Sequence, residues 1–157
     1  MFKSWLKHAL AFLGILIAAW LALAIWEGYK IERGRDAVQA LADAMKQEQE
    51  ENYQRAMADT YGGKTPQETL RMYIDAVEKG DYELASKYFV FEHQEKWRSE
   101  LIEINRVNKI AEFVDPLREA LESTGEYSYD KKQYFYDNPV GIDFILYPNG
   151  IWKILEI

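Results

Sequence analysis

Cysteine is absent from the 157 residues of this chain, and its absence removes a whole group of functions. Without a thiol there is no disulfide, no cysteine nucleophile, no thiolate ligand for zinc or an iron–sulfur cluster, and no lipid-modified cysteine. The absence of cysteine does not indicate whether the protein is in an oxidising or a reducing compartment. Any chemistry or binding therefore has to come from carboxylates, amines, hydroxyls and aromatic rings.

Histidine is also scarce, and acidic residues outnumber basic ones. The chain has 2 histidines, and its 19 basic residues against 26 acidic ones give a net charge of −7. An acidic chain repels the phosphate backbone, so we expect no nucleic acid partner. His93 lies between Glu92 and Glu95, which favour a helix start, so we interpret it as a surface residue rather than a metal ligand. We expect neither a metal nor a cofactor.

One long stretch carries no charge at all. Residues 9–26 read ALAFLGILIAAWLALAIW, which reaches the length that a membrane-spanning helix requires. We therefore predict a membrane anchor over residues 1–26 that contacts lipid through residues 9–26. A cleaved secretory signal is the alternative, because Ala22-Leu23-Ala24 offers a cleavage site. The apolar run continues past that site, which favours a retained anchor.

The basic residues around the anchor bear on its orientation. Lys3 and Lys7 precede the apolar run, but more basic residues follow it, so their count alone does not place the short end inside. A positive start before a single apolar run is nevertheless typical of a signal anchor. We predict a single-pass membrane protein whose soluble domain is extracytoplasmic.

Residues 27–64 contain no proline and are rich in alanine, glutamate, glutamine and lysine, which favours a helical stalk or linker. Val38, Leu41, Ala42 and Met45 form an apolar stripe on this helix, but polar residues interrupt it after Met45. A sustained coiled coil requires more turns of such a seam. Local packing is therefore favoured over weak self-association.

A helix-start signal opens the remaining region, residues 65–157. Thr65 is suited to cap the helix, Pro66 to occupy its first position and Glu68 to complete a capping box. The preceding Gly63-Lys64-Thr65 is similar to the end of a phosphate-binding loop. That motif would need glycine where Ala58 stands and a strand before the loop, so we reject it.

Periodicity divides this region into helices followed by strands. Apolar residues at helical spacing predict helices over about 66–79, 82–90 and 92–113, and a short helix that begins at Asp115-Pro116 and ends near Gly125. Alternating tyrosines then predict a hairpin over 127–136. Two more strands, 140–147 and 151–157, flank the turn Pro148-Asn149-Gly150. We expect an antiparallel meander with helices packed on one face.

Two segments resemble nuclear-transport-factor-two-like domains, which are also called cystatin-like cones. Residues 65–70 (TPQETL) and 73–85 (YIDAVEKGDYELA) are similar to the opening helices of that family, with its Lys-Gly-Asp corner at 79–81. Residues 143–154 (DFILYPNGIWKI) are similar to its last hairpin. The resemblance implies an α+β fold in which an N-terminal transmembrane helix and a helical stalk precede helices packed on a curved antiparallel sheet. Members of this family include enzymes, small-molecule binders and interaction modules.

The family's ketosteroid-isomerase-like enzymes imply one catalytic candidate, a carboxylate that abstracts a proton inside the cone. Asp143 is the best match, although a solvent-facing position on its strand is the favoured interpretation. No nucleophile-elbow or zinc-protease motif occurs. We therefore predict no catalytic residue.

Aromatic and acidic side chains suggest instead a possible groove or interface, and we expect most of them to be core. The candidates are Tyr73, Tyr88, Trp97, Tyr134, Tyr136, Asp143 and Trp152.

These observations predict a membrane-anchored envelope protein whose α+β domain is a binding or scaffold module. Its candidate partners are membrane lipid, an unidentified protein and a small apolar ligand. Family members behind a single anchor include scaffold subunits of type IV secretion machines, so a subunit of a large membrane or secretion complex is one alternative. An isomerase-like enzyme that uses Asp143 is the other.

Overall fold

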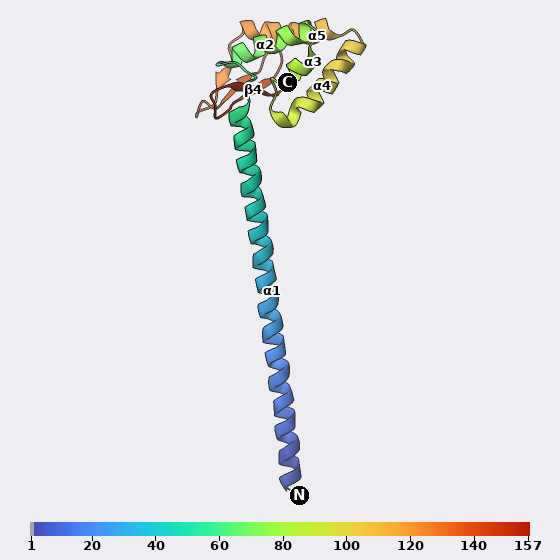
Figure 1. Cartoon of the computed structure of the whole chain (residues 1–157), viewed down its shortest axis with the longest axis vertical. Helices are drawn as coiled ribbons and strands as arrows, with labels where there is room; N and C mark the ends of the chain where they lie inside the picture. Colours follow the sequence, from blue (N-terminus) through green and yellow to red (C-terminus); the bar gives the residue numbers. More distant parts are fainter. Residues whose placement is uncertain (1) are drawn as a thin grey trace. The chain divides into compact units, whose positions relative to one another are not determined.

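The computed structural model describes residues 2–157, with the side chains of residue 8 and of residues 13–26 and 38–157 (Figure 1). The chain divides into two compact units, Met1–Glu51 and Asn52–Ile157. The second unit therefore begins before residue 65, where the sequence places the start of the domain.

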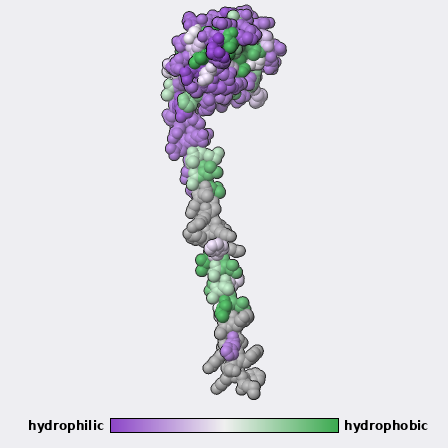
Figure 2. Space-filling view, turned by 90° about the vertical axis from the view of Figure 1, so that its right-hand side faces the viewer, coloured by the Kyte–Doolittle hydropathy of each residue, from purple (hydrophilic) through white to green (hydrophobic). Residues whose placement is uncertain are grey.

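Helix α1 (Phe2–Ala58) runs without interruption through the predicted stalk, so the helix prediction is confirmed up to Ala58. Its described side chains expose large apolar groups over residues 13–26 and again at Val38, Leu41 and Met45. On the face shown in Figure 2, hydrophobic bands mark these parts of α1, whereas hydrophilic residues cover most of the second unit. The side chains of residues 9–12, where the predicted span begins, lie outside the described residues. Within the described part, no helix is both long and apolar enough to cross a membrane.

The cap of the next helix is the one that the sequence predicts, and the helix after it is capped in the same way. Helix α2 (Pro66–Glu78) begins with Thr65, whose hydroxyl accepts a hydrogen bond of 3.1 Å from the backbone N–H of Glu68. The carboxylate of Glu68 accepts in turn from the backbone N–H of Lys64. Helix α3 (Tyr82–Ser86) begins with Asp81 as its cap. These side chains satisfy amide groups that a helix start otherwise leaves unpaired.

The third predicted helix, 92–113, is wrong in extent, because two helices occupy this region. Helix α4 (Phe91–Arg106) ends where Asn108 adopts a left-handed conformation with φ of 55°. The backbone N–H groups of Asn108 and Lys109 donate back to the carbonyls of Asn105 and Ile104, which closes the helix end. Asparagine tolerates this conformation better than most residues do.

Helix α5 (Ile110–Glu122) also begins earlier than predicted. Pro116 lies inside it rather than at its start. The helix continues through this proline because Val114, Leu117 and Ala120 form one buried side against the rest of the domain. Burial of that side outweighs the backbone hydrogen bond that proline cannot donate.

The strands form the predicted meander. Strands β1 (Glu126–Tyr127), β2 (Gln133–Tyr136), β3 (Ile142–Leu146) and β4 (Trp152–Glu156) lie in the order β1-β2-β3-β4, and each neighbouring pair is antiparallel. The unit is thus an α+β fold in which helices pack against a four-stranded antiparallel sheet, as predicted (Figure 1).

The two faces of the sheet differ because side chains alternate along each strand. One face, the inner face, contributes buried apolar side chains to a core shared with α2, α4 and α5. Its members are Tyr134, Tyr136, Ile142, Phe144, Trp152 and Ile154. Asp143, Ile145 and Lys153 therefore lie on the opposite, outer face.

The free side of β4 is occupied by the chain itself. The backbone N–H of Trp152 donates to the carbonyl of Gly63, and that of Ile154 donates to the carbonyl of Tyr88. Val90 donates in turn to the carbonyl of Ile154. Gly62 fits beside β4 because a side chain there would collide with the carbonyl oxygen of Trp152, and because its φ of 147° favours glycine.

Candidate functional site

The six aromatic residues that the sequence nominates for a groove or interface are core residues in the structure. Each of them is at most 5% exposed, and all belong to one apolar cluster. They are Tyr73, Tyr88, Trp97, Tyr134, Tyr136 and Trp152. Their expected role at an exposed groove stays a prediction.

Three of these core residues carry polar atoms without a hydrogen-bond partner among the described residues: the hydroxyls of Tyr73 and Tyr136 and the indole nitrogen of Trp97. Burial raises the pKa of Tyr73 far above its ordinary value, so the phenol is neutral at every physiological pH. Tyr134 differs, because its hydroxyl accepts from the side-chain amide of Gln67 at 2.8 Å and from the backbone N–H of Gly125 at 3.0 Å. Tyr134 thus contributes polar contacts to the core.

Asp143 does not join the aromatic cluster. It lies between the fully buried Ile142 and Phe144 on β3, so its carboxylate is on the outer face, away from the core. Burial, and then the charges of Asp137 and Glu156, raise the pKa of Asp143 above its ordinary value. A position outside the core argues against a base enclosed in a cone.

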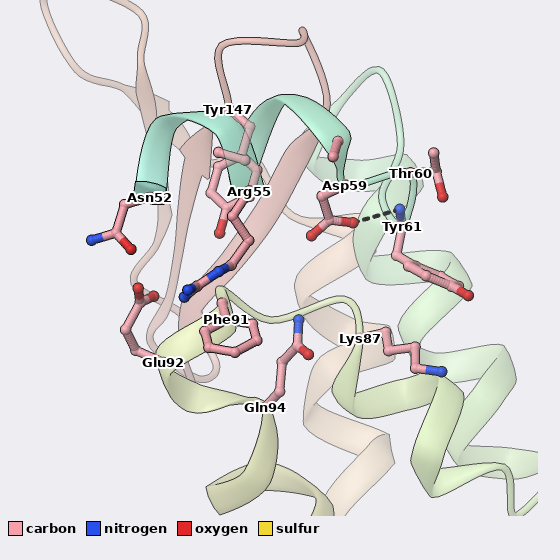
Figure 3. A pocket seen from close by; sticks show the side chains of 12 residues that line it. Asn52, Arg55, Asp59, Thr60, Tyr61, Lys87, Phe91, Glu92, Gln94 and Tyr147 are labelled. Carbon is pink, nitrogen blue, oxygen red and sulfur yellow. Dashed lines mark hydrogen bonds between the residues drawn. The ribbon is translucent and has the colours of Figure 1, made fainter. Parts of the chain in front are cut away.

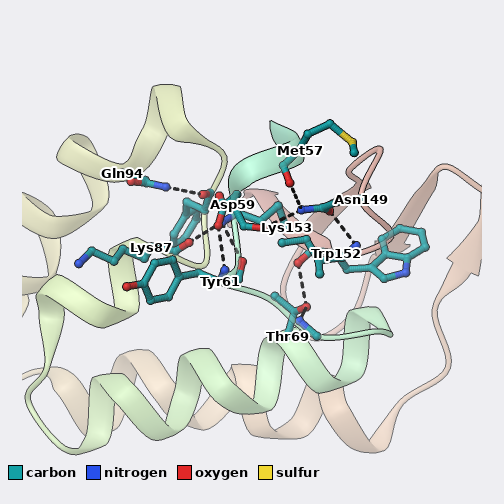
Figure 4. Close-up of polar contacts among 12 residues, drawn as sticks. Met57, Asp59, Tyr61, Thr69, Lys87, Gln94, Asn149, Trp152 and Lys153 are labelled. Carbon is teal, nitrogen blue, oxygen red and sulfur yellow. Dashed lines mark hydrogen bonds and ion pairs between the residues drawn. The ribbon is translucent and has the colours of Figure 1, made fainter. Parts of the chain in front are cut away.

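The outer face instead holds a buried lysine that sequence reasoning missed. Lys153 on β4 is 0% exposed. Its ammonium nitrogen donates to the Asp59 carboxylate at 2.7 Å and to the backbone carbonyls of Tyr61 and Lys87 (Figure 4). We call Lys153, Asp59 and these two carbonyls the Lys153 cluster. An ammonium has three donors, and all three are used.

The electrostatics of the cluster balance two opposing effects. Burial lowers the pKa of Lys153, whereas the hydrogen bond and the charge of Asp59 oppose that shift. The second oxygen of Asp59 accepts from the backbone N–H of Tyr61 at 2.8 Å. The cluster therefore stabilises the position of residues 59–61 against the sheet and leaves no free donor for catalysis.

Asn149 adds a second connection to the same segment. Its side-chain amide donates to the backbone carbonyl of Asp59 at 2.6 Å, and its side-chain oxygen accepts from the backbone N–H of Ile151 at 3.1 Å (Figure 4). The β3–β4 turn thus binds the chain just after α1. The signal that predicts a turn here does not reveal this second role.

A cavity of about 290 Å³ lies beside the cluster. Its walls come from the last residues of α1, residues 59–61, Lys87, the start of α4 and Tyr147 (Figure 3). We call it the Arg55 pocket. Phe91 and Tyr61 provide exposed aromatic surface in it, at 52% and 40%. All of its walls belong to the second compact unit.

Arg55 is the most distinctive group in this pocket. Its guanidinium carbon lies 4.0 Å from the centre of the Phe91 ring, in a cation–π contact. None of the ion pairs found between described side chains includes Arg55. Lys87, by contrast, lies over the Tyr61 ring and pairs with Glu83 at 3.4 Å. The pocket thus contains one guanidinium whose charge is uncompensated by a close carboxylate.

Tyr147 forms another part of the wall, and its pKa is raised to about 12, chiefly by burial. A hydrogen bond from the Phe91 backbone opposes that shift, and the charges of Glu92 and Asp59 add to it. The phenol is therefore neutral at pH 7 and contributes no charge.

A second cavity and His93 give less support for a function than the Arg55 pocket does. A second, more apolar cavity of about 330 Å³ lies between α4, α5 and the sheet, where Ile104, Phe113 and Val140 line it. The Nδ1 of His93 donates to the Leu155 carbonyl at 2.6 Å and lies 3.5 Å from a carboxylate oxygen of Glu156. Among the described residues, no three carboxylate or imidazole side chains lie together as a metal site.

Comparisons with known proteins supply no assignment for this geometry. The chain matches no protein-family model, and no curated protein or solved structure matches it at a significant level.

Proposed function

We propose that this chain is a single-pass membrane protein whose domain, residues 52–157, binds a partner protein as an envelope scaffold. The lipid contact would be made by residues 9–26, and the domain would lie outside the cytoplasm. Two features support this anchor: the apolar run in the sequence, and the large apolar side chains of residues 13–26 that α1 leaves exposed. The likeness to nuclear-transport-factor-two-like domains remains part of the proposal.

The single observation that carries a binding function is the Arg55 pocket. It combines exposed aromatic surface with a cation that lacks a carboxylate partner among the described residues. Exposed aromatic rings and arginine are the residue types enriched at protein interfaces. The nearby Lys153 and Asp59 are fully used in a structural cluster, so they are not available as an acid–base pair. Recognition fits this arrangement better than catalysis does.

The first experiment tests the membrane location of the full chain. After cell fractionation, we expect the protein in the membrane pellet, retained after a high-salt and carbonate wash and released by detergent. Intact mass of the purified protein would retain the residues before position 27. Recovery of a soluble form cleaved after Ala24 would contradict the anchor.

The second experiment tests the pocket as a binding site in intact membranes. A photoreactive amino acid replaces Tyr61 in the pocket or, as the matched control, Tyr129, which is fully exposed in the β1–β2 turn. We expect one discrete adduct from position 61 and none of that mass from position 129. The variant Ala56→Phe fills the pocket and should abolish the adduct while the melting temperature stays unchanged. Equal adducts at both positions would overturn the proposal.

An isomerase-like activity is the weaker alternative because Asp143 faces away from the core. Turnover of a small carbonyl substrate by the purified protein, abolished by Asp143→Asn, would establish it over the binding function.

A further inference from the structure

The guanidinium of Arg55 is held in a position suited to a planar anion. Its guanidinium carbon lies over the Phe91 ring, 4.0 Å from the ring centre, so the ring covers one side of the group. Guanidinium edges donate two parallel hydrogen bonds to a carboxylate. The ring contact also restricts the side chain before any ligand arrives, which lowers the entropic cost of binding.

The other charges around the pocket leave this anion-binding capacity intact. Lys153 is neutralised by Asp59 and is buried below the surface. Lys87 adds positive charge at another wall, although it shares that charge with Glu83. Glu92 is the one lining carboxylate outside the Lys153 cluster, and it is exposed to solvent, which screens it.

The pocket walls next to Arg55 determine which chemical group can bind beside the anion. Phe91, Tyr61 and Ala56 offer apolar surface, and Tyr147 is neutral. A cavity of about 290 Å³ accommodates roughly one residue of a bound chain rather than a whole helix. The occupant is therefore a small apolar group with a carboxylate directly beside it.

We propose that the Arg55 pocket binds the C-terminal carboxylate of a partner protein whose last residue is apolar, with Arg55 as the anion-binding residue. This inference rests on the proposed binding function and names the partner's chemistry. A chain terminus carries its carboxylate and its last side chain on the same carbon, which matches the adjacent cation and aromatic surface. It also enters a one-residue cavity without a turn in the partner's backbone.

The test uses the full chain in detergent micelles and measures affinity by calorimetry and NMR titration. The probe is N-acetyl-Gly-Phe with a free carboxylate, and the matched control is the same dipeptide with a C-terminal amide. We expect the acid to bind about tenfold more tightly than the amide. Equal affinity for the acid and the amide would overturn the inference.

Three variants assign the effect to Arg55. Arg55→Gln should abolish the preference for the acid, whereas Arg106→Gln should keep it, because Arg106 is an exposed arginine of α4 paired with Glu103 outside the pocket. Glu92→Gln removes a competing negative charge and should increase affinity for the acid about twofold. An unchanged preference in Arg55→Gln, with the fold intact by circular dichroism, would refute the role of Arg55.

A third probe distinguishes the two sources of a carboxylate. N-acetyl-Asp-Phe-amide carries its carboxylate on a side chain and has a blocked end. Weaker binding than that of N-acetyl-Gly-Phe supports a chain terminus, and equal or tighter binding overturns it. The photoreactive adduct at position 61 is independent of these results. If it forms and persists in Arg55→Gln, the scaffold function stands while the carboxylate inference fails.

Discussion

The two sides of the sheet are buried by different means. On the inner face, aromatic rings pack on one another: Phe89 stacks on Trp97 with ring centres 4.7 Å apart and meets Tyr73 edge-on at 5.3 Å. On the outer face, a single ammonium is surrounded by one carboxylate and two carbonyls. Apolar packing loses free energy in proportion to the contacts removed. The Lys153 cluster instead depends on each polar partner, because a buried charge without its counter-charge is strongly unfavourable.

Mutations on the two faces of the sheet should therefore destabilise the domain in different ways. A cavity in the core cannot be repaired by a second deletion, whereas a buried ion pair can be replaced by two apolar groups at little cost. Variants on the two faces can measure this difference between apolar packing and a buried ion pair.

The largest loss is expected in the core. Phe89→Ala removes a ring that is 0% exposed and contacts two other aromatic residues, so it should lower the free energy of unfolding by about 3–5 kcal/mol. Urea denaturation monitored by tryptophan fluorescence measures the change. A loss below about 1 kcal/mol would mean that the core repacks freely, and the contrast with the outer face would disappear.

The Lys153 cluster comes next. Asp59→Ala should cost about 3 kcal/mol because Lys153 is left without its counter-charge, and the double variant Asp59→Ala with Lys153→Met should recover at least half of that loss. The exposed pair of Glu103 and Arg106 is the control, and Glu103→Ala should cost less than about 0.5 kcal/mol. No recovery in the double variant would contradict the comparison.

The same cluster predicts a pH dependence. Burial lowers the pKa of Lys153 in the folded state, so the unfolded chain binds more protons between that lowered pKa and the ordinary value of about 10.4. Stability contributed by this group therefore rises with pH across that window. Asp59→Ala removes the opposing carboxylate and should steepen the rise. Denaturation curves at alkaline pH, up to about 10.4, measure it, with Lys153→Met as the variant that should show no such rise.

Two buried tyrosines allow a comparison between a core hydroxyl that has hydrogen-bond partners and one that has none among the described residues. Tyr134→Phe removes the acceptor of two hydrogen bonds and should cost about 1–2 kcal/mol. Tyr73→Phe removes a hydroxyl with no partner among the described residues and should cost nothing or stabilise the protein. Thermal melts of the two variants give the comparison directly, and equal losses would show that Tyr73 has a partner in solution.

The smallest effect concerns Asp143 on the outer face. Its pKa is raised in the folded state, so its contribution to stability is present at acidic pH and is lost as the pH rises through that value. Asp143→Asn should therefore stabilise the protein at pH 7, by less than about 1 kcal/mol because the group is partly solvated. At about pH 3 the gain should vanish. A loss of stability at pH 7 would show that Asp143 has a stabilising partner.

Much of the fold follows from local signals. The cap at Thr65, the turn at Pro148-Asn149-Gly150 and the alternation along β2 to β4 each depend on residues close together in sequence, and the structure confirms them. The break at Asn108 was not predictable in this way, because apolar periodicity continues through 107 and only the left-handed asparagine interrupts it. The helix start that the sequence predicts at Asp115-Pro116 is wrong, because burial of one side of α5 overrides the local start signal of the proline.

The candidate site could not be predicted from residues that are close together in the sequence. Lys153 alternates with Trp152 and Ile154, and such a pattern predicts an exposed lysine. Its burial depends on Asp59, which is 94 positions away in the sequence. The Arg55 pocket likewise combines four separate segments of the chain, and no motif marks their meeting. Of the seven residues nominated from sequence, none lines this pocket.

The contacts of β4 have a further consequence for how the domain forms. Thr69 reaches the carbonyl of Trp152 across 83 positions, and Asp59 reaches Lys153 across 94. Closing such long loops costs chain entropy before any contact compensates for it, and topologies rich in distant contacts fold slowly. Helix α3 packs on both α2 and α4, its neighbours in sequence, so these three helices can assemble early. We expect the insertion of β4 between Gly63 and β3 to come later and to be slow.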